Sequence, residues 1–164
     1  MHDELTAVDI QKMKDEIAER TARTAFLLEE VKRTRDLGDL SENDEYRSAK
    51  RELNRNRSRI RYLKAMIETA IVIDVKSEAD QAGLFDEITL TYEDGRERVV
   101  RIVTTLRNDV FSNCISKESP FGRAVLGHRV GDKVEVNTGA KTYQVTISKI
   151  VKGEDDASLP INSF

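Results

Sequence analysis

The side chains that could do chemistry in this sequence gather in ten residues, 37–46, which read L-G-D-L-S-E-N-D-E-Y. The stretch from 36 to 45 holds five carboxylates and no basic residue, namely Asp36, Asp39, Glu42, Asp44 and Glu45. Carboxylate oxygens suit Mg²⁺, but two exposed carboxylates hold it weakly because this ion dehydrates reluctantly. Asp39 and Glu42 could therefore share a Mg²⁺ only together with ligands from elsewhere.

The alternative is that these acidic residues only complement the dipole at the start of a helix, at about 0.3–1 kcal/mol each. That alternative explains Asp39 least, because this residue precedes the expected cap. A turn between helices is also convex and has no pocket that excludes water. Any chemistry by these carboxylates is therefore expected to take place inside a partner.

Other catalytic and metal-binding chemistries find little support in the composition. His2 and His128 are the only histidines, which disfavours Ser-His-Asp triads and His-rich zinc sites, and no G-x-x-x-x-G-K-[ST] phosphate loop occurs. The single Cys114 excludes an internal disulfide, fits a reducing compartment and is expected to be a buried hydrophobe. No apolar run reaches the ~20 residues that span a bilayer, and no signal peptide is recognisable, so we expect a cytoplasmic protein that does not contact a membrane.

One helix is predicted to end before the acidic turn and another to begin after it. Gly38 is the expected stop, because glycine adopts a positive φ at little steric cost. Ser41 is the expected N-cap of the second helix, with Asp44 three residues later as in a capping box. The first helix is predicted to run from an N-cap at Thr6 to about Arg35.

Both helices carry a seam with alternating spacings of three and four residues, which is typical of a coiled coil. The seam is Ile10, Met13, Ile17, Arg20, Thr24, Leu27, Val31 and Thr34, and then Tyr46, Ala49, Leu53, Asn56, Ile60, Leu63, Ile67 and Ala70. A short turn makes the helices antiparallel, so the seams fold onto one another with Thr24 opposite Asn56. Such a polar layer lowers stability but selects one register.

A strongly basic stretch follows the acidic turn. Residues 47–64 carry eight Lys or Arg and one acid, Glu52. A charge run is often only a solvated helix face. The functional interpretation is a shaft that passes close to nucleic acid or an acidic protein surface, with Arg47, Lys50, Arg51 and Arg55 as the nucleic-acid-facing residues.

The remaining chain predicts a small antiparallel sheet. Alternating apolar residues indicate strands over 88–92, 99–103, 110–116, 134–136 and 143–147, with a hairpin turn at Asp94-Gly95. Ser119 and Pro120 open a short covering helix as N-cap and first residue. The predicted class is α+β: a helical hairpin over 1–72 with its acidic tip at 37–46, a sheet domain over 75–152, and a flexible tail over 153–164.

Two long motifs resemble one protein family. The sequence G-D-L-S-E-N-D-E-Y-R-S-A-K at 38–50 resembles the tip motif of the bacterial Gre transcript cleavage factors. The sequences S-P-F-G-R-A-V-L-G at 119–127 and V-G-D-K-V at 130–134 resemble their C-terminal signature. The resemblance covers nearly the whole chain and is stronger for the A-type than for the B-type members.

The resemblance implies an antiparallel coiled coil followed by a domain like the FK506-binding proteins (FKBP-like). It implies binding to RNA polymerase, insertion of the coiled coil into the secondary channel, and stimulated hydrolysis of the nascent RNA 3′ end in backtracked complexes. The polymerase would be the enzyme, and Asp39 and Glu42 would help it to retain a catalytic Mg²⁺, with Ser41 and Tyr46 as supporting neighbours. Docking to polymerase would use Ser119, Pro120, Phe121 and Gly122.

Two departures from the family pattern leave alternatives open. Asp44 replaces a small residue, and the first helix lacks a Pro that many members carry. One alternative is a homologue that blocks the channel without promoting cleavage. A peptidyl-prolyl isomerase is suggested only by fold analogy, and the sheet is poor in aromatic residues. A dimeric scaffold is disfavoured because each chain pairs its own seam, so we expect a monomer.

Overall fold

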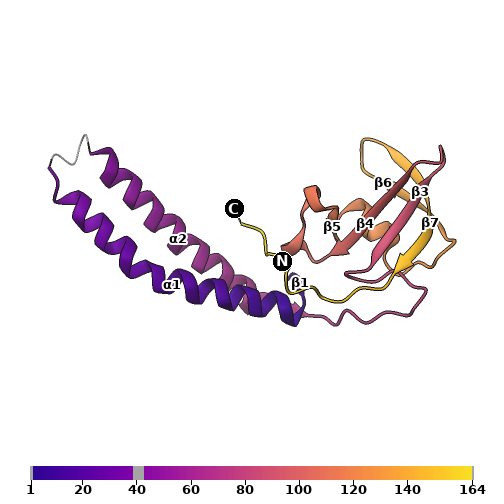
Figure 1. Ribbon diagram of the computed structural model, residues 1–164, viewed down its shortest axis with the longest axis horizontal. Helices are drawn as coiled ribbons and strands as arrows, with labels where there is room; N and C mark the ends of the chain where they lie inside the picture. Colours follow the sequence, from indigo (N-terminus) through magenta and orange to yellow (C-terminus); the bar gives the residue numbers. More distant parts are fainter. Residues whose placement is uncertain (1, 39–42, 164) are drawn as a thin grey trace. The chain divides into compact units, whose positions relative to one another are not determined.

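The computed structural model describes residues 2–38 and 43–163. The chain divides into two compact units, one formed mainly by Ile10–Ala70 and the other by Asp3–Asp9 with Ile71–Phe164. Residues 3–9, which we assigned to the hairpin, fall in the second unit because β1 (Glu4–Leu5) pairs in parallel with β2 (Ile71–Val72). The predicted α+β class, a helical hairpin followed by a sheet domain with one covering helix, is confirmed (Figure 1).

The hairpin consists of α1 (Ala7–Arg35) and α2 (Asp44–Thr69), which run side by side (Figure 1). The predicted start of α1 is confirmed. The Thr6 hydroxyl accepts a hydrogen bond from the Asp9 N–H at 3.2 Å, and the Asp9 carboxylate accepts one from the Thr6 N–H at 3.0 Å. This reciprocal capping box satisfies two backbone donors that a helix start leaves without partners. No helix of the described residues is both long and apolar enough to cross a membrane.

The seam between the helices is buried as the heptad pattern predicts. Met13, Leu27, Leu53 and Leu63 are all at most 5 % exposed. The predicted polar layer is confirmed, because the Asn56 amide donates to the Thr24 hydroxyl at 3.1 Å and to a backbone carbonyl of α1 at 3.0 Å. The Asn56 amide has these partners only in the observed register of the two helices. In a shifted register it would face apolar side chains without a hydrogen bond, so it selects the observed one.

We expect Asn56→Leu to leave the melting temperature unchanged or to raise it, while the pairing of the helices loosens. The Arg20 carbonyl that the amide contacts also accepts from Thr24, so no buried acceptor is stranded. Thermal unfolding measures the first effect, and cysteine cross-linking across the seam measures the second. Asn54→Leu, at an exposed site of the same helix, is the control. A large fall in melting temperature for Asn56→Leu alone would contradict the prediction.

A buried ion pair next to this layer was not foreseen from the sequence. The Arg59 side chain is 6 % exposed, and its Nε donates to Glu16 at 2.9 Å, while the Arg20 Nε donates to the same carboxylate at 2.6 Å. Burial raises the pKa of Glu16, but the hydrogen bonds from Arg59 and Arg20 outweigh it and hold the pKa below its ordinary value. Glu16 therefore stays ionised and compensates the buried arginine.

Glu16→Gln should destabilise the hairpin, because it leaves the Arg59 charge buried without its counter-ion. The folded-state pKa of Glu16 lies below its unfolded value of about 4.3, so its contribution is complete above that pH and is lost as the pH falls toward the folded pKa. Denaturation curves should then give the wild type a higher free energy of unfolding than Glu16→Gln. This difference should be constant at neutral pH and shrink below about pH 4.3. An advantage independent of pH down to acid unfolding would show that the charge of Glu16 is not what matters.

The second unit contains a five-stranded sheet in the order β5-β4-β3-β7-β6. Its strands are β3 (Glu87–Tyr92), β4 (Glu97–Val103), β5 (Cys114–Ser116), β6 (Lys133–Asn137) and β7 (Thr142–Val151). The sheet is mixed and not wholly antiparallel as predicted, because β5 pairs in parallel with β4. Two short 3-10 helices, Thr105–Arg107 and Val110–Ser112, make the crossover that parallel pairing requires, so the predicted strand over 110–116 is shorter.

The core of this unit lies between the sheet and α3 (Pro120–Val125), where Ile88, Leu90, Ile102, Val125 and Ile147 are fully buried. Cys114 is 3 % exposed and belongs to this core, as expected. Burial raises the pKa of its thiol, which disfavours the reactive thiolate.

A buried arginine connects three distant parts of this unit. Arg107 donates from Nε to Asp9 at 2.7 Å and from Nη1 to the Asp156 carbonyl at 2.8 Å, and its Nη2 lies 2.6 Å from an Asp155 oxygen. Its guanidinium also lies 5.0 Å from the centre of the Phe85 ring, a cation–π contact. The side chains of Arg107 and Asp9 are both 0 % exposed, so neither charge has compensation from bulk water.

The segment after β7 differs from the flexible tail that we predicted. Besides Asp155 and Asp156 at Arg107, the Gly153 N–H donates to the Asp86 carboxylate at 2.9 Å, and the Asn162 N–H donates to the Leu106 carbonyl at 2.7 Å. Acidic composition suggested disorder, but two of these acidic residues lie at a buried arginine. The segment therefore forms part of the domain.

Candidate functional site

Three regions carry the predicted functional residues: the turn between α1 and α2, the basic shaft on α2, and the segment that opens α3. The turn begins where α1 ends. The Thr34 hydroxyl donates back to the Glu30 carbonyl at 2.8 Å, and the Leu37 N–H donates to the Thr34 carbonyl at 3.3 Å. Gly38 follows with φ of 140°, which confirms the predicted positive φ at the helix stop.

Asn43 joins the two helix ends, and sequence reasoning missed it. Its side-chain NH₂ donates to the Thr34 carbonyl at 2.6 Å, and its side-chain oxygen accepts from the Tyr46 N–H at 2.9 Å. One amide thus satisfies an end carbonyl of α1 and a free donor of α2. Asn43 is the N-cap of α2, in place of the predicted Ser41. Asn is as good an N-cap as Ser, so the residue type alone could have suggested it.

The predicted catalytic and metal-binding residues Asp39 and Glu42, with Ser41, lie outside the described residues. The Asp44 carboxylate is 94 % exposed and lies 3.7 Å from Arg47. Within residues 2–38 and 43–163, no group of three or more His, Cys, Asp or Glu side chains is placed to hold a metal ion. Asp39 and Glu42 supply the oxygen donors that Mg²⁺ prefers, but a complete coordination shell needs further ligands.

Tyr46 and the four shaft residues are described in full. Tyr46 is half-buried, and the Lys50 Nζ lies 5.8 Å from the centre of its ring, a cation–π contact. Arg47, Lys50, Arg51 and Arg55 are all exposed. A helix turns by about 100° per residue, so Lys50 and Arg55 point about 140° apart. All four therefore lie within an arc of about 140° on α2, and their contact with nucleic acid stays a prediction.

The predicted docking segment begins as the sequence suggested. Ser119 is the N-cap of α3 and accepts from the Gly122 N–H at 3.0 Å, and Pro120 occupies the first turn. A Cβ at Gly122 would lie 2.3 Å from the Ser116 carbonyl oxygen, so only glycine fits against that backbone. Gly122 is buried and holds α3 close to β5, whereas Pro120 is exposed and available to a partner.

Phe121 belongs to an aromatic cluster at one end of the sheet. Its ring centre lies 6.0 Å from that of Tyr143, which in turn lies 5.8 Å from Tyr92. The Arg98 guanidinium lies 5.3 Å from the centre of the Phe121 ring. These side chains are half-buried. Phe121 thus has a packing role whether or not it also contacts a partner.

Comparison with known families gives matches over both units. Residues 4–72 match the family model described as "Transcription elongation factor, N-terminal", and residues 77–152 match "Transcription elongation factor, GreA/GreB, C-term". The predicted motifs at 38–50 and 119–134 fall inside these two matches.

Relatives named transcription elongation factor GreA align over most of the chain. The Thermotoga neapolitana protein is 38 % identical over 145 residues, covering 86 % of this chain and 93 % of that protein. The Thermotoga maritima protein is 37 % identical with the same coverage. The Geobacillus kaustophilus protein is 39 % identical over 121 residues, covering 73 % of this chain and 77 % of that protein.

Solved structures with a similar fold include the transcription factor Gfh1, at a TM-score of 0.46 and 22 % identity, covering 92 % of this chain and 97 % of that chain. A GreA/GreB elongation factor from Nitrosomonas europaea aligns at a TM-score of 0.41 and 23 % identity, covering 57 % of this chain and 79 % of that one.

Proposed function

Because this chain belongs to the GreA/GreB family of transcription elongation factors, we propose that it stimulates RNA cleavage by RNA polymerase in backtracked elongation complexes. Membership rests on relatives that align over most of the chain and on both family models. The observation that supports the specific activity is the stretch Gly38–Lys50, which keeps Asp39 and Glu42 and connects the two helices of the hairpin. The protein acts as a transcription factor and depends on the polymerase for an active site.

The length of the hairpin allows the turn at one end to act far from the other end of the two helices. With 29 residues, α1 is about 44 Å long at 1.5 Å per residue, and its buried seam makes it a rigid carrier for the turn. Such a rod can enter a channel that a globular domain cannot. The enclosed site of the polymerase provides the exclusion of water that an exposed turn lacks.

Asp39 and Glu42 would hold a Mg²⁺ jointly with the polymerase and the nascent RNA 3′ end. When bound, that ion supplies charge neutralisation and activation of water for phosphodiester hydrolysis. Asn43 contributes by holding the ends of α1 and α2 together through its hydrogen bonds to Thr34 and Tyr46. The two attachment points of the turn are therefore held at a fixed distance. Tyr46 lies within the first turn of α2 and is placed to support the same region.

Docking to polymerase through Ser119–Gly122 would anchor the protein outside the channel. Pro120 is exposed at the start of α3, and Gly122 fixes that helix against β5. A division of labour follows, in which the sheet unit binds and the hairpin tip assists chemistry.

The direct test adds the protein to a stalled, backtracked elongation complex whose RNA is labelled at its 5′ end. We expect the labelled RNA to shorten and then to be re-extended when nucleotides are added. A parallel complex labelled at the RNA 3′ end should release short labelled fragments, which distinguishes internal cleavage from reversal of polymerisation. Binding with inhibition but no shortened RNA would contradict the proposal and would identify the protein as a channel-blocking homologue.

A further inference from the structure

The two sides of the α1–α2 seam differ in charge. On one side, ion pairs connect the helices, because Arg23 pairs with Glu52 and Glu16 pairs with the buried Arg59. The other side is formed by the residues that directly follow every second seam residue. On α1 these are Lys14, Thr21, Leu28 and Arg35, and on α2 they are Lys50, Arg57 and Lys64. None of these is acidic. This second side therefore has an excess of positive charge, and of its cations only Arg35 lies near a carboxylate among the described ion pairs, Asp36 at 3.9 Å.

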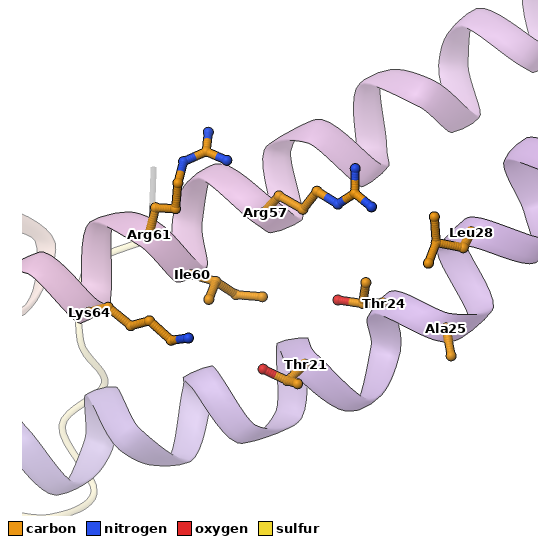
Figure 2. A pocket seen from close by; sticks show the side chains of 8 residues that line it. All are labelled: Thr21, Thr24, Ala25, Leu28, Arg57, Ile60, Arg61 and Lys64. Atoms are coloured by element: carbon orange, nitrogen blue, oxygen red, sulfur yellow. The ribbon is translucent and has the colours of Figure 1, made fainter.

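A groove of about 520 Å³ runs along this second side. Figure 2 shows its lining side chains, which come from both helices. Thr21, Ala25 and Leu28 line it from α1, and Ile60 lies between the helices. Leu28 is 44 % exposed although it is a large apolar residue. The α1 side and Ile60 thus offer small and apolar side chains that allow another chain to approach closely.

Three cations line the groove from α2. Arg57 and Lys64 lie seven residues apart, two helical turns or about 10 Å, and Arg61 lies between them. Within the described residues, no carboxylate pairs with any of the three, and Arg61 bonds only to the Ser58 hydroxyl. A row of three cations beside an apolar strip is complementary to an amphipathic helix with acidic residues at its margin.

We propose that this groove binds an acidic amphipathic helix of RNA polymerase, an inference that rests on the proposed function. Small residues such as Ala25 and Thr21 leave room for a third helix to approach α1, since packed helices lie about 8–10 Å apart. Single-stranded RNA is the less complementary occupant. Proteins bind its bases by stacking them on aromatic side chains, and no aromatic side chain lines the groove.

The occupant can be identified with a photoreactive benzoylphenylalanine placed at Leu28 in the full-length protein. Phe26, which is 61 % exposed and is not among the lining residues, is the matched control position. Each protein is mixed with core polymerase that is free of DNA and RNA, irradiated, and analysed by mass spectrometry. We expect position 28 to cross-link to a polymerase helix rich in Asp and Glu, and position 26 to give at least severalfold less of that product.

Charge complementarity is tested by the affinity of Arg57→Glu/Lys64→Glu for the same core polymerase. We expect a loss of roughly tenfold, since two exposed ion pairs become repulsive. Lys141→Glu/Lys149→Glu, which changes the net charge equally at exposed sites on β7 and before it, should bind like the wild type. Circular dichroism verifies that both variants keep the hairpin.

The outcomes separate this inference from the proposed function. Failure of the wild-type protein to bind core polymerase would contradict the proposed function itself. Wild-type binding combined with equal affinity of the two double variants would overturn the groove proposal alone. A cross-link from position 28 that forms only with RNA in elongation complexes would also overturn it, and would assign the groove to nucleic acid.

Discussion

Asp39→Asn and Glu42→Gln are each expected to lower the rate of stimulated RNA cleavage by roughly a hundredfold to a thousandfold. Both changes keep the size of the side chain and remove only its charge. A carboxylate that helps to hold Mg²⁺ in an enclosed site contributes far more than one in water, because little solvent is present to replace it. Cleavage is measured as the single-turnover rate of RNA shortening in a backtracked complex.

The competing explanation predicts a very different result. If these carboxylates only complement the dipole of α2, their loss should cost a few tenths of a kcal/mol in stability and leave cleavage intact. Binding to polymerase should survive in either case, because docking is assigned to the sheet unit. A higher Mg²⁺ concentration should partly restore cleavage to the single variants only if the side chains contribute to metal affinity.

Asp44→Ala is the matched control, because it removes a nearby negative charge from the same acidic turn. Its carboxylate is 94 % exposed and lies 3.7 Å from Arg47, so its charge is already partly compensated. Asp44→Ala should keep most of the activity. An equal loss for Asp39, Glu42 and Asp44 variants would mean that bulk negative charge matters and that specific ligation does not.

Asp9→Asn is expected to destabilise the sheet unit by about 3 kcal/mol. Asn keeps an oxygen that can accept from the Thr6 N–H, so the cap survives while the carboxylate charge is lost. The Arg107 side chain, 0 % exposed, then loses one of its two carboxylate partners. Chemical denaturation followed by the near-ultraviolet signal of the aromatic cluster gives the free energy of unfolding.

A double-mutant cycle separates the ion pair from general damage to the core. Arg107→Met leaves Asp9 buried without its arginine and should also destabilise strongly, but the double variant should cost less than the sum of the two changes. Asp94→Asn, which breaks the exposed pair with Arg96, should leave the unfolding midpoint nearly unchanged. Strictly additive losses in the cycle would show that Arg107 and Asp9 do not interact energetically.

The features that could be predicted from the sequence depend on residues close together in the chain or on the heptad repeat of the seam. The seam follows a heptad period, and this spacing was enough to predict that Thr24 and Asn56 meet in one polar layer. The caps at Thr6 and Ser119 and the stop at Gly38 depend on residues within one helical turn. The chemistry assigned to Asp39 and Glu42 likewise rests on the sequence, since these residues lie outside the described part of the chain.

Only the tertiary structure decided the features whose partners are far apart along the chain. Asn43 joins two helix ends only once the hairpin has closed. Arg59 can be buried because the folded hairpin brings Glu16, 43 residues earlier in the chain, into contact with it. Arg107 looks like an ordinary surface arginine until Asp9, 98 residues earlier, and Asp155 converge on it. The parallel pairing of β5 likewise depends on a crossover with no periodic signal. A buried charge is tolerated only where its counter-ions meet, and their meeting point is set by the folded chain as a whole.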